Sequence, residues 1–227
     1  MRSLLTAVVG GCALALFVLP VSAQPPGGGR GGMGRGGMGG PGMLVNNKSV
    51  QKELQMTDDQ AKKAREATQQ VREKHQEEMQ ALREMDPQEA REKGTALMRT
   101  MSEEADKALA DVLKPEQMKR LKQISLQQRG AQSFTDPKVQ EELKLTDDQK
   151  DKIKTINADF DKERGEIFQS MQNGGDREEA MKKFATLRTE TVDKVKALLT
   201  DDQKKTWESI TGAPFEVKFE ARRGGGA

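Results

Sequence analysis

Apolar residues recur every three or four positions in two separate stretches of the chain, and this spacing predicts amphipathic α-helices. The stripe of the first stretch consists of Ala64, Thr68, Val71, His75, Met79 and Leu82. The stripe of the second consists of Ile153, Ile156, Phe160, Ile167, Phe168 and Met171. Each series predicts one long helix with a single apolar face.

Each long helix is followed by a turn and a second helix. In the first stretch Asp86 can cap the second helix and Pro87 suits its first turn, and residues 173–176, Asn-Gly-Gly-Asp, take the same place in the second stretch. The second helices carry the apolar positions Ala90, Leu97, Met101, Ala105, Ala108 and Val112, and then Phe184, Leu187, Val195, Leu198 and Leu199. Because the turns are short, each pair should form an antiparallel hairpin. A third, shorter helix follows each hairpin and should end at Gly130 or Gly212.

Four helix starts share one motif. In a capping box, a threonine hydroxyl accepts a backbone N–H, and a glutamine three residues later reaches back to the threonine N–H. The sequence predicts this box at Thr57 with Gln60, at Thr146 with Gln149, and at Thr200 with Gln203. The fourth copy keeps Gln117 but has Lys114 in place of threonine, so its side-chain cap is lost, and Pro115 partly compensates. These residues are expected to stabilise helix starts and not to carry chemistry.

The motifs recur in an order that indicates an internal repeat. Residues 50–60 superpose on residues 139–149 at an offset of 89 positions, and the region around Gln117 superposes on that around Gln203 at an offset of 86. Two homologous halves follow, at residues 46–130 and 135–213. We therefore expect an all-α fold of two tandem helical-hairpin units, each with two long helices and one short helix. Since a hairpin with a narrow stripe leaves apolar surface uncovered, the halves can pack as an intramolecular pseudo-dimer.

Composition agrees with long helices and narrows the choice of partners. The 227 residues are 34% hydrophobic and 33% charged, which suits amphipathic helices better than a deep globular core. Lys and Arg total 38 against 36 Asp and Glu, so no net field draws the chain to nucleic acid or to a membrane surface. Partners should therefore be recognised by local surface.

The first residues read as a secretory signal peptide over residues 1–23. Arg2 supplies the positive charge, residues 4–19 the apolar run, and Val21-Ser22-Ala23 the cleavage site. We expect export to the periplasm or beyond the cell, with cleavage near Ala23; an uncleaved anchor is the alternative. The only cysteine, Cys12, lies in this segment, so the mature chain would have no thiol, disulfide or cysteine ligand.

Two terminal segments have low complexity. Residues 24–45, rich in Gly, Arg and Met, are predicted to be a disordered tether, and residues 214–227 a C-terminal tail. An arginine-glycine segment that binds RNA or another polyanion is the alternative interpretation of the first. Export of the protein favours the tether.

The motifs resemble those of a known family. A Leu-Thr-x-x-Gln motif that opens a long helix, a second such motif that opens a shorter helix, a signal peptide and few aromatic residues are similar to the Spy/CpxP family of periplasmic proteins. The motif matches fully at residues 145–149 and 199–203, with Met56 for leucine at residues 56–60, and only in part at residues 113–117. The resemblance covers residues 50–213, and it departs from the family plan because the chain carries two units in tandem.

The resemblance implies a fold and a function. Family members are helical hairpins that assemble as antiparallel, cradle-shaped homodimers, and some are ATP-independent chaperones that hold unfolding proteins. Relatives with histidine-rich or cysteine-rich additions bind zinc, nickel or cobalt. We therefore expect a periplasmic chaperone or envelope-stress binding protein whose partners are unfolded or misfolded envelope proteins. A metal-responsive sensor or scavenger, and a structural envelope protein without clients, are the alternatives.

The candidates for chemistry in the chain are few. No phosphate-binding loop, no Gly-x-Ser-x-Gly elbow and no cysteine nucleophile of the mature chain is found, so we predict no enzymatic activity and no cofactor. His75, the sole histidine, is a weak candidate for a metal ligand. Arg72 stands where a Glu-x-x-His motif needs its glutamate, and Arg164 occupies the equivalent of position 75, which together favour a structural histidine without metal.

Methionine and aromatic residues are the remaining candidates for a binding surface. Trp207 is expected to be a core anchor for the last short helix, and Phe134 and Phe215 to pin the chain after each short helix. Flexible thioethers suit promiscuous binding, although a stripe of them more often belongs to a core. The methionines considered are Met79, Met85, Met98, Met101, Met118, Met171 and Met181.

Overall fold

The computed structural model describes residues 39–219, and within them every regular element is a helix. The prediction of an all-α fold is therefore confirmed. The first half of the described chain consists of α1 (Pro41–Leu44), α2 (Lys48–Glu53), α3 (Asp58–Lys74), α4 (Gln76–Ala81), α5 (Pro87–Ala110) and α6 (Pro115–Arg129). The second half consists of the 3-10 helix η1 (Gly130–Thr135), α7 (Pro137–Glu142), α8 (Asp147–Gln172), α9 (Arg177–Ala197) and α10 (Asp201–Thr211).

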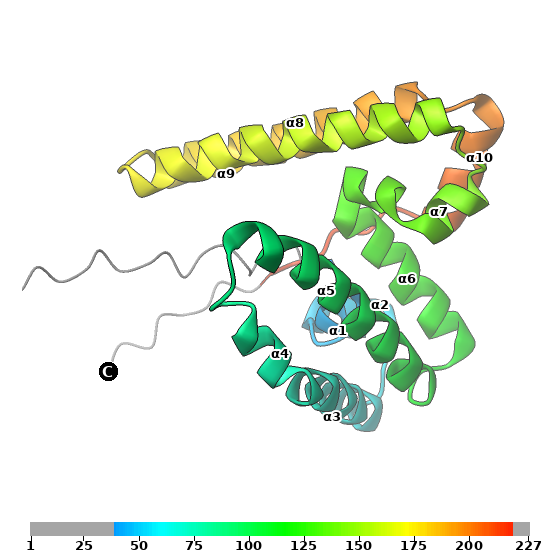
Figure 1. Ribbon diagram of the computed structural model, residues 1–227. Helices are drawn as coiled ribbons and strands as arrows, with labels where there is room; N and C mark the ends of the chain where they lie inside the picture. Colours follow the sequence, from blue (N-terminus) through cyan, green and yellow to red (C-terminus); the bar gives the residue numbers. More distant parts are fainter. Residues whose placement is uncertain (1–38, 220–227) are drawn as a thin grey trace, which may run out of the picture. The chain divides into compact units, whose positions relative to one another are not determined.

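The long helices pair as the short turns predict. Helices α8 and α9 lie side by side as a long hairpin, and α3 packs against α5 (Figure 1). Asp86 and Asp176 each cap the second helix of a pair, accepting from a backbone N–H at 2.9 Å. Helices α6 and α10 end at Gly130 and Gly212, whose φ angles of 58° and 62°, with ψ of −131° and −162°, form a backbone conformation that is almost restricted to glycine.

One predicted helix is broken. The first long helix was expected to run through position 75, but it divides there into α3 and α4, and His75 has φ −101° and ψ 14°. In the second half, α8 continues without interruption through the equivalent Arg164. The two side chains also differ in their contacts, because His75 is buried and contacts Glu104 of α5, whereas Arg164 pairs with Asp161 of its own helix at 3.0 Å.

Most of the buried apolar residues within residues 39–219 form two separate clusters instead of one deep core. The first gathers Leu44, Val45, Val50, Leu54, Ala64, Leu109, Leu113, Met118, Leu121, Ile124 and Val217. The second gathers Ala131, Phe134, Val139, Leu143, Leu145, Ile153, Val195, Leu199 and Trp207. Trp207 is buried and stacks on Phe134, with ring centroids 4.0 Å apart, which confirms its expected role as a core anchor.

The segments that follow the short helices pack into the opposite cluster. Ala131 and Phe134 come after α6 of the first half but lie in the second cluster, while Phe215 and Val217 come after α10 of the second half and pack on the first. The Phe215 N–H also donates to Gln127 of α6 at 2.9 Å. These segments therefore join the two halves and do not pin the chain only onto its own hairpin.

Three expected boundaries need correction. The tether predicted at residues 24–45 ends too late, because Leu44 and Val45 are buried in the first cluster. Residues 131–134, left between the two expected units, belong to a core, and so does part of the tail predicted at residues 214–227. The sequence did not indicate that these short segments are part of a core, because each contributes only two or three apolar side chains. The predicted signal peptide at residues 1–23 lies outside the described residues.

None of the helices within residues 39–219 combines the length and the apolar character needed to cross a membrane.

Candidate functional site

The threonine motifs form capping boxes. The Thr57, Thr146 and Thr200 hydroxyls accept the backbone N–H three residues on, at 3.1, 3.2 and 3.3 Å. The glutamine oxygens accept the N–H of the capping threonine in return, at 3.2 Å for Gln60, 3.0 Å for Gln149 and 2.9 Å for Gln203. At the fourth motif only the return bond forms, from the Lys114 N–H to Gln117 at 2.9 Å, because an ammonium group cannot accept.

The motif glutamines also bind one another across the fold, which the sequence did not reveal. The Gln60 amide donates to the Gln117 oxygen at 2.9 Å and accepts from the Gln117 amide at 3.2 Å. The remaining N–H groups donate to the carbonyls of Val112 and Leu54, at 3.1 and 2.9 Å. With the capping bonds, each side-chain amide uses both its donors and both its acceptor positions. The starts of α3 and α6 are therefore fastened together.

The second half contains an equivalent pair. Gln149 and Gln203 exchange bonds of 2.8 and 3.0 Å, and their other N–H groups donate to Leu198 at 2.7 Å and to Lys144 at 3.3 Å. The sequence motif predicted only one role for each glutamine, which is to accept the N–H of the threonine that caps the same helix. The similar separation of the two glutamines in each half was the one sequence signal that they could be partners. All seven motif residues thus act as scaffold.

His75 lies between two carboxylates. Its side chain is only 7% exposed, Nε2 is 3.0 Å from Glu104 Oε2 on α5, and Nδ1 is 3.2 Å from Glu78 Oε2 on α4. Lys74 reaches the other oxygen of Glu104 at 2.7 Å. The hydrogen bond to Glu104 raises the pKa of His75 above its ordinary value, against the opposing effect of burial, and the bond from Lys74 lowers the pKa of Glu104.

The geometry around His75 does not suit a shared metal ion. The two carboxylates face opposite ring nitrogens, so they cannot join one nitrogen in binding the same ion. Among residues 39–219 no group of three or more His, Cys, Asp or Glu side chains is arranged to hold a metal. The absence of a metal site stays a prediction, and His75 is best described as an ion-pairing residue.

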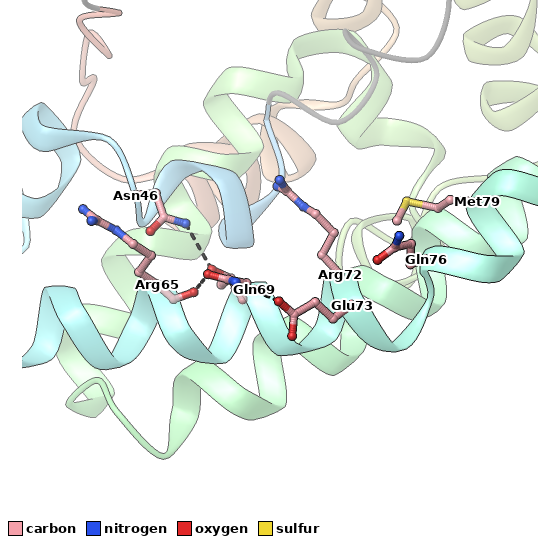
Figure 2. A pocket seen from close by; sticks show the side chains of 8 residues that line it. Asn46, Arg65, Gln69, Arg72, Glu73, Gln76 and Met79 are labelled. Atoms are coloured by element: carbon pink, nitrogen blue, oxygen red, sulfur yellow. Dashed lines mark hydrogen bonds between the residues drawn. The ribbon is translucent and has the colours of Figure 1, made fainter.

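A shallow hollow of about 400 Å³ lies along α3 and α4 (Figure 2). Its lining mixes two guanidinium groups, three side-chain amides, a hydroxyl, a carboxylate and a thioether. These belong to Asn46, Arg65, Thr68, Gln69, Arg72, Glu73, Gln76 and Met79. The lining on α3 and α4 recurs every three or four residues, so it forms one continuous helical face, and the break at His75 falls within it.

Asn46 forms the wall of the hollow opposite this face. Its Nδ2 donates to the Gly42 carbonyl at 3.0 Å and to the Thr68 hydroxyl at 3.1 Å, which ties the segment after α1 to α3 (Figure 2). Its Oδ1 is buried and has no hydrogen-bond partner within residues 39–219. Gln69 donates to Glu73 at 2.7 Å, so one oxygen of the single carboxylate in the hollow already accepts a hydrogen bond from a neighbour.

Sequence reasoning named Thr68, Arg72 and Met79 separately but did not group them as a site, because it followed apolar positions and the hollow is mostly polar. The other methionines considered above lie outside this hollow. Met118 is buried in the first cluster, while Met98 and Met181 are 46% and 41% exposed. The mixed surface therefore arises where polar residues of α3 face a segment that precedes the first capping box.

A second hollow of about 390 Å³ contains an arginine that already makes structural hydrogen bonds. It is lined by Gln127, Ala185, Arg188, Thr189, Val192, Asp193 and Lys196. The Arg188 guanidinium donates to the carbonyls of Gln127 and Gln128, at 2.9 and 2.7 Å, and its burial lowers the pKa of Arg188. Arg188 thus satisfies the end of α6, and the hollow along α3 and α4 is the better candidate for a binding site.

Comparison with known proteins adds one family match. A family model described as a domain of unknown function (DUF4890) matches residues 122–207, which is less than half of the chain. The match begins within α6 and ends within α10, so it contains the α8–α9 hairpin and the Phe134–Trp207 stack. Neither the comparison with curated proteins nor the comparison with solved structures found a match.

Proposed function

We propose that this protein is an exported, ATP-independent binding protein that holds unfolded segments of other envelope proteins, as its resemblance to the Spy/CpxP family implies. The observation that carries the proposal is the open hollow along α3 and α4, where cationic, amide and thioether groups lie on one face. A surface of this kind offers several weak modes of contact and imposes no single shape on its partner.

The side chains of the hollow suit such binding. Arg65, Arg72, Gln69 and Gln76 are exposed and have long, flexible stems, so one partner can contact their methylene groups and another their polar ends. Met79 is half-buried and supplies an adaptable apolar contact. Two arginines against one carboxylate, itself bonded to Gln69, favour segments that carry both acidic and apolar residues.

The tandem arrangement belongs to the same proposal. Two equivalent glutamine pairs and the segments that pack in each other's clusters support two repeated units joined as an intramolecular pseudo-dimer. A unit that depends on the other for part of its core does not need a second chain to cover its apolar stripe.

The proposal is tested by aggregation of a reduced, unfolding client in the absence of ATP. Near-stoichiometric protein should suppress the aggregation. No suppression at excess would remove this function, and suppression would separate it from the metal-responsive sensor and the structural envelope protein.

A pair of charge reversals tests the hollow itself. Arg65→Glu with Arg72→Glu should raise the concentration needed for half suppression of an acidic client by about tenfold, which corresponds to about 1.4 kcal/mol. The matched control is Lys154→Glu with Lys162→Glu, the same change of charge on exposed residues of α8. Equal losses in the two variants would show that the hollow is not the binding site.

A further inference from the structure

The two ring nitrogens of His75 can both donate hydrogen bonds to their carboxylate neighbours only when the ring is charged. Both ring nitrogens face carboxylate oxygens, Glu104 at 3.0 Å and Glu78 at 3.2 Å. An imidazolium carries an N–H on each nitrogen, whereas a neutral imidazole carries one and presents a lone pair at the other. In the neutral form one carboxylate therefore faces a lone pair and loses its hydrogen bond to the ring.

The charges around the ring favour the same form. The charged groups that contact His75 and its partners come from all three packed elements, namely Lys74 at the end of α3, Glu78 of α4 and Glu104 of α5. With the ring charged, two cations meet two carboxylates. When the ring loses its proton, Lys74 is the one cation left among these groups. Lys74 contacts Glu104, so Glu78 loses its cationic partner.

The position of His75 couples these bonds to the hollow. His75 is the residue at which α3 ends and α4 begins. Arg72 and Glu73 line the hollow from α3, and Gln76 and Met79 line it from α4. Because the lining spans the break, any change in the direction of α4 relative to α3 changes the width of the hollow.

We propose that His75 is a proton-operated latch, whose charged form holds the α3–α4 break against α5 and whose neutral form releases α4 and reshapes the hollow. The other half of the chain serves as an internal contrast, since the equivalent Arg164 is permanently charged and α8 is continuous there. The effect of the latch on clients rests on the proposed function, whereas the latch itself does not.

The direction of the pH effect follows from linkage. The carboxylates raise the pKa of His75 in the folded protein. The latch therefore contributes its full stability below the unfolded pKa and loses it as the pH rises through the folded pKa. The protection of α4 amide groups against hydrogen exchange should fall about tenfold for each unit by which the folded pKa of His75 exceeds the unfolded pKa.

Two measurements on the full chain test the latch without any client. His75 is the sole histidine, so its ring signals can be followed by NMR without assignment of others, and their midpoint should lie above the unperturbed value of about 6.5. The Glu104→Gln variant should lower that midpoint. A midpoint at or below the unperturbed value in the unaltered chain would overturn the proposal, and this titration needs no variant to fold.

Hydrogen exchange then locates the response. Protection in α4, corrected for intrinsic exchange, should be lower at about pH 8.5 than at about pH 5.5, while protection in α8 around Arg164 should not change. His75→Gln, which keeps N–H donors but cannot titrate, should remove the pH dependence in α4, and Arg164→Gln should preserve it. An equal pH dependence in His75→Gln would overturn the latch. Client binding that fails at every pH while α4 still responds would count against the proposed function alone.

Discussion

Gln149 and Gln203 each donate a side-chain N–H to the other's oxygen, at 2.8 and 3.0 Å, although they stand at the starts of different helices. Each oxygen also accepts the N–H of its own capping threonine. The pair therefore joins two local caps into one tertiary contact. Because Gln149 is buried, loss of its partner leaves polar groups that water cannot easily reach to form replacement hydrogen bonds.

The first prediction is that the two glutamines are energetically coupled. Gln149→Ala and Gln203→Ala should each lower the free energy of unfolding by about 1 to 3 kcal/mol, since each removes two hydrogen bonds from the other amide. The double variant should cost less than the sum of the two, which urea unfolding of all four proteins measures. Gln172→Ala, at the exposed end of α8, is the control for loss of an amide. Additive losses would mean that the pair contributes nothing beyond the separate caps.

The incomplete fourth box predicts a stabilising change. Lys114 has φ −66° and ψ 157°, close to the −69° and 160° of the capping Thr146, so a threonine fits there without strain. Lys114→Thr should supply the missing acceptor for the Gln117 N–H and raise the free energy of unfolding by about 0.5 to 1 kcal/mol. Lys114→Ala removes the same side chain without adding an acceptor and serves as the control. A threonine variant no more stable than the alanine variant would refute the explanation.

The sequence predicted what depends on neighbouring residues. The caps at Thr57 and Thr146, the turn at Pro87 and the glycine ends of α6 and α10 are all where local physics places them. Each of these features is decided within about four residues, which a sequence displays directly.

The sequence did not predict what depends on distant partners. The bonds from Gln60 to Gln117 and from His75 to Glu104 join residues that no helical period relates. Periodicity marked position 75 as inward-facing. It could not show that His75 contacts a carboxylate on α5 or that the helix is interrupted at this position. The hollow was missed for a similar reason, because Asn46 reaches its wall from a segment that lies before the first predicted helix.

The exchange of segments between the clusters predicts where a shortened chain fails. A chain that ends at Ala213 lacks Phe215 and Val217, which pack on the first cluster although they follow the last helix of the second half. Hydrogen exchange should therefore show greater loss of protection in α3 and α5 than in α8 and α9. A chain that ends at Phe219 keeps both residues and is the control. Greater loss in α8 and α9 would contradict the described packing.

The last prediction concerns Asp106, a carboxylate on α5 whose Oδ1 is buried and has no hydrogen-bond partner within the described residues. Burial raises the pKa of Asp106, in spite of the nearby charges of Lys122 and Lys138 that lower it. A raised folded pKa means that the carboxyl favours the folded state most below its unfolded pKa and loses this advantage as the pH rises through the folded pKa. Asp106→Asn, which cannot ionise, should therefore be more stable than the unaltered protein near pH 7, and the difference should shrink in acid. Urea unfolding at several pH values measures both effects, with the exposed Asp111→Asn as the control. A destabilised Asp106→Asn variant near pH 7 would show that attraction to the two lysines outweighs the cost of burial.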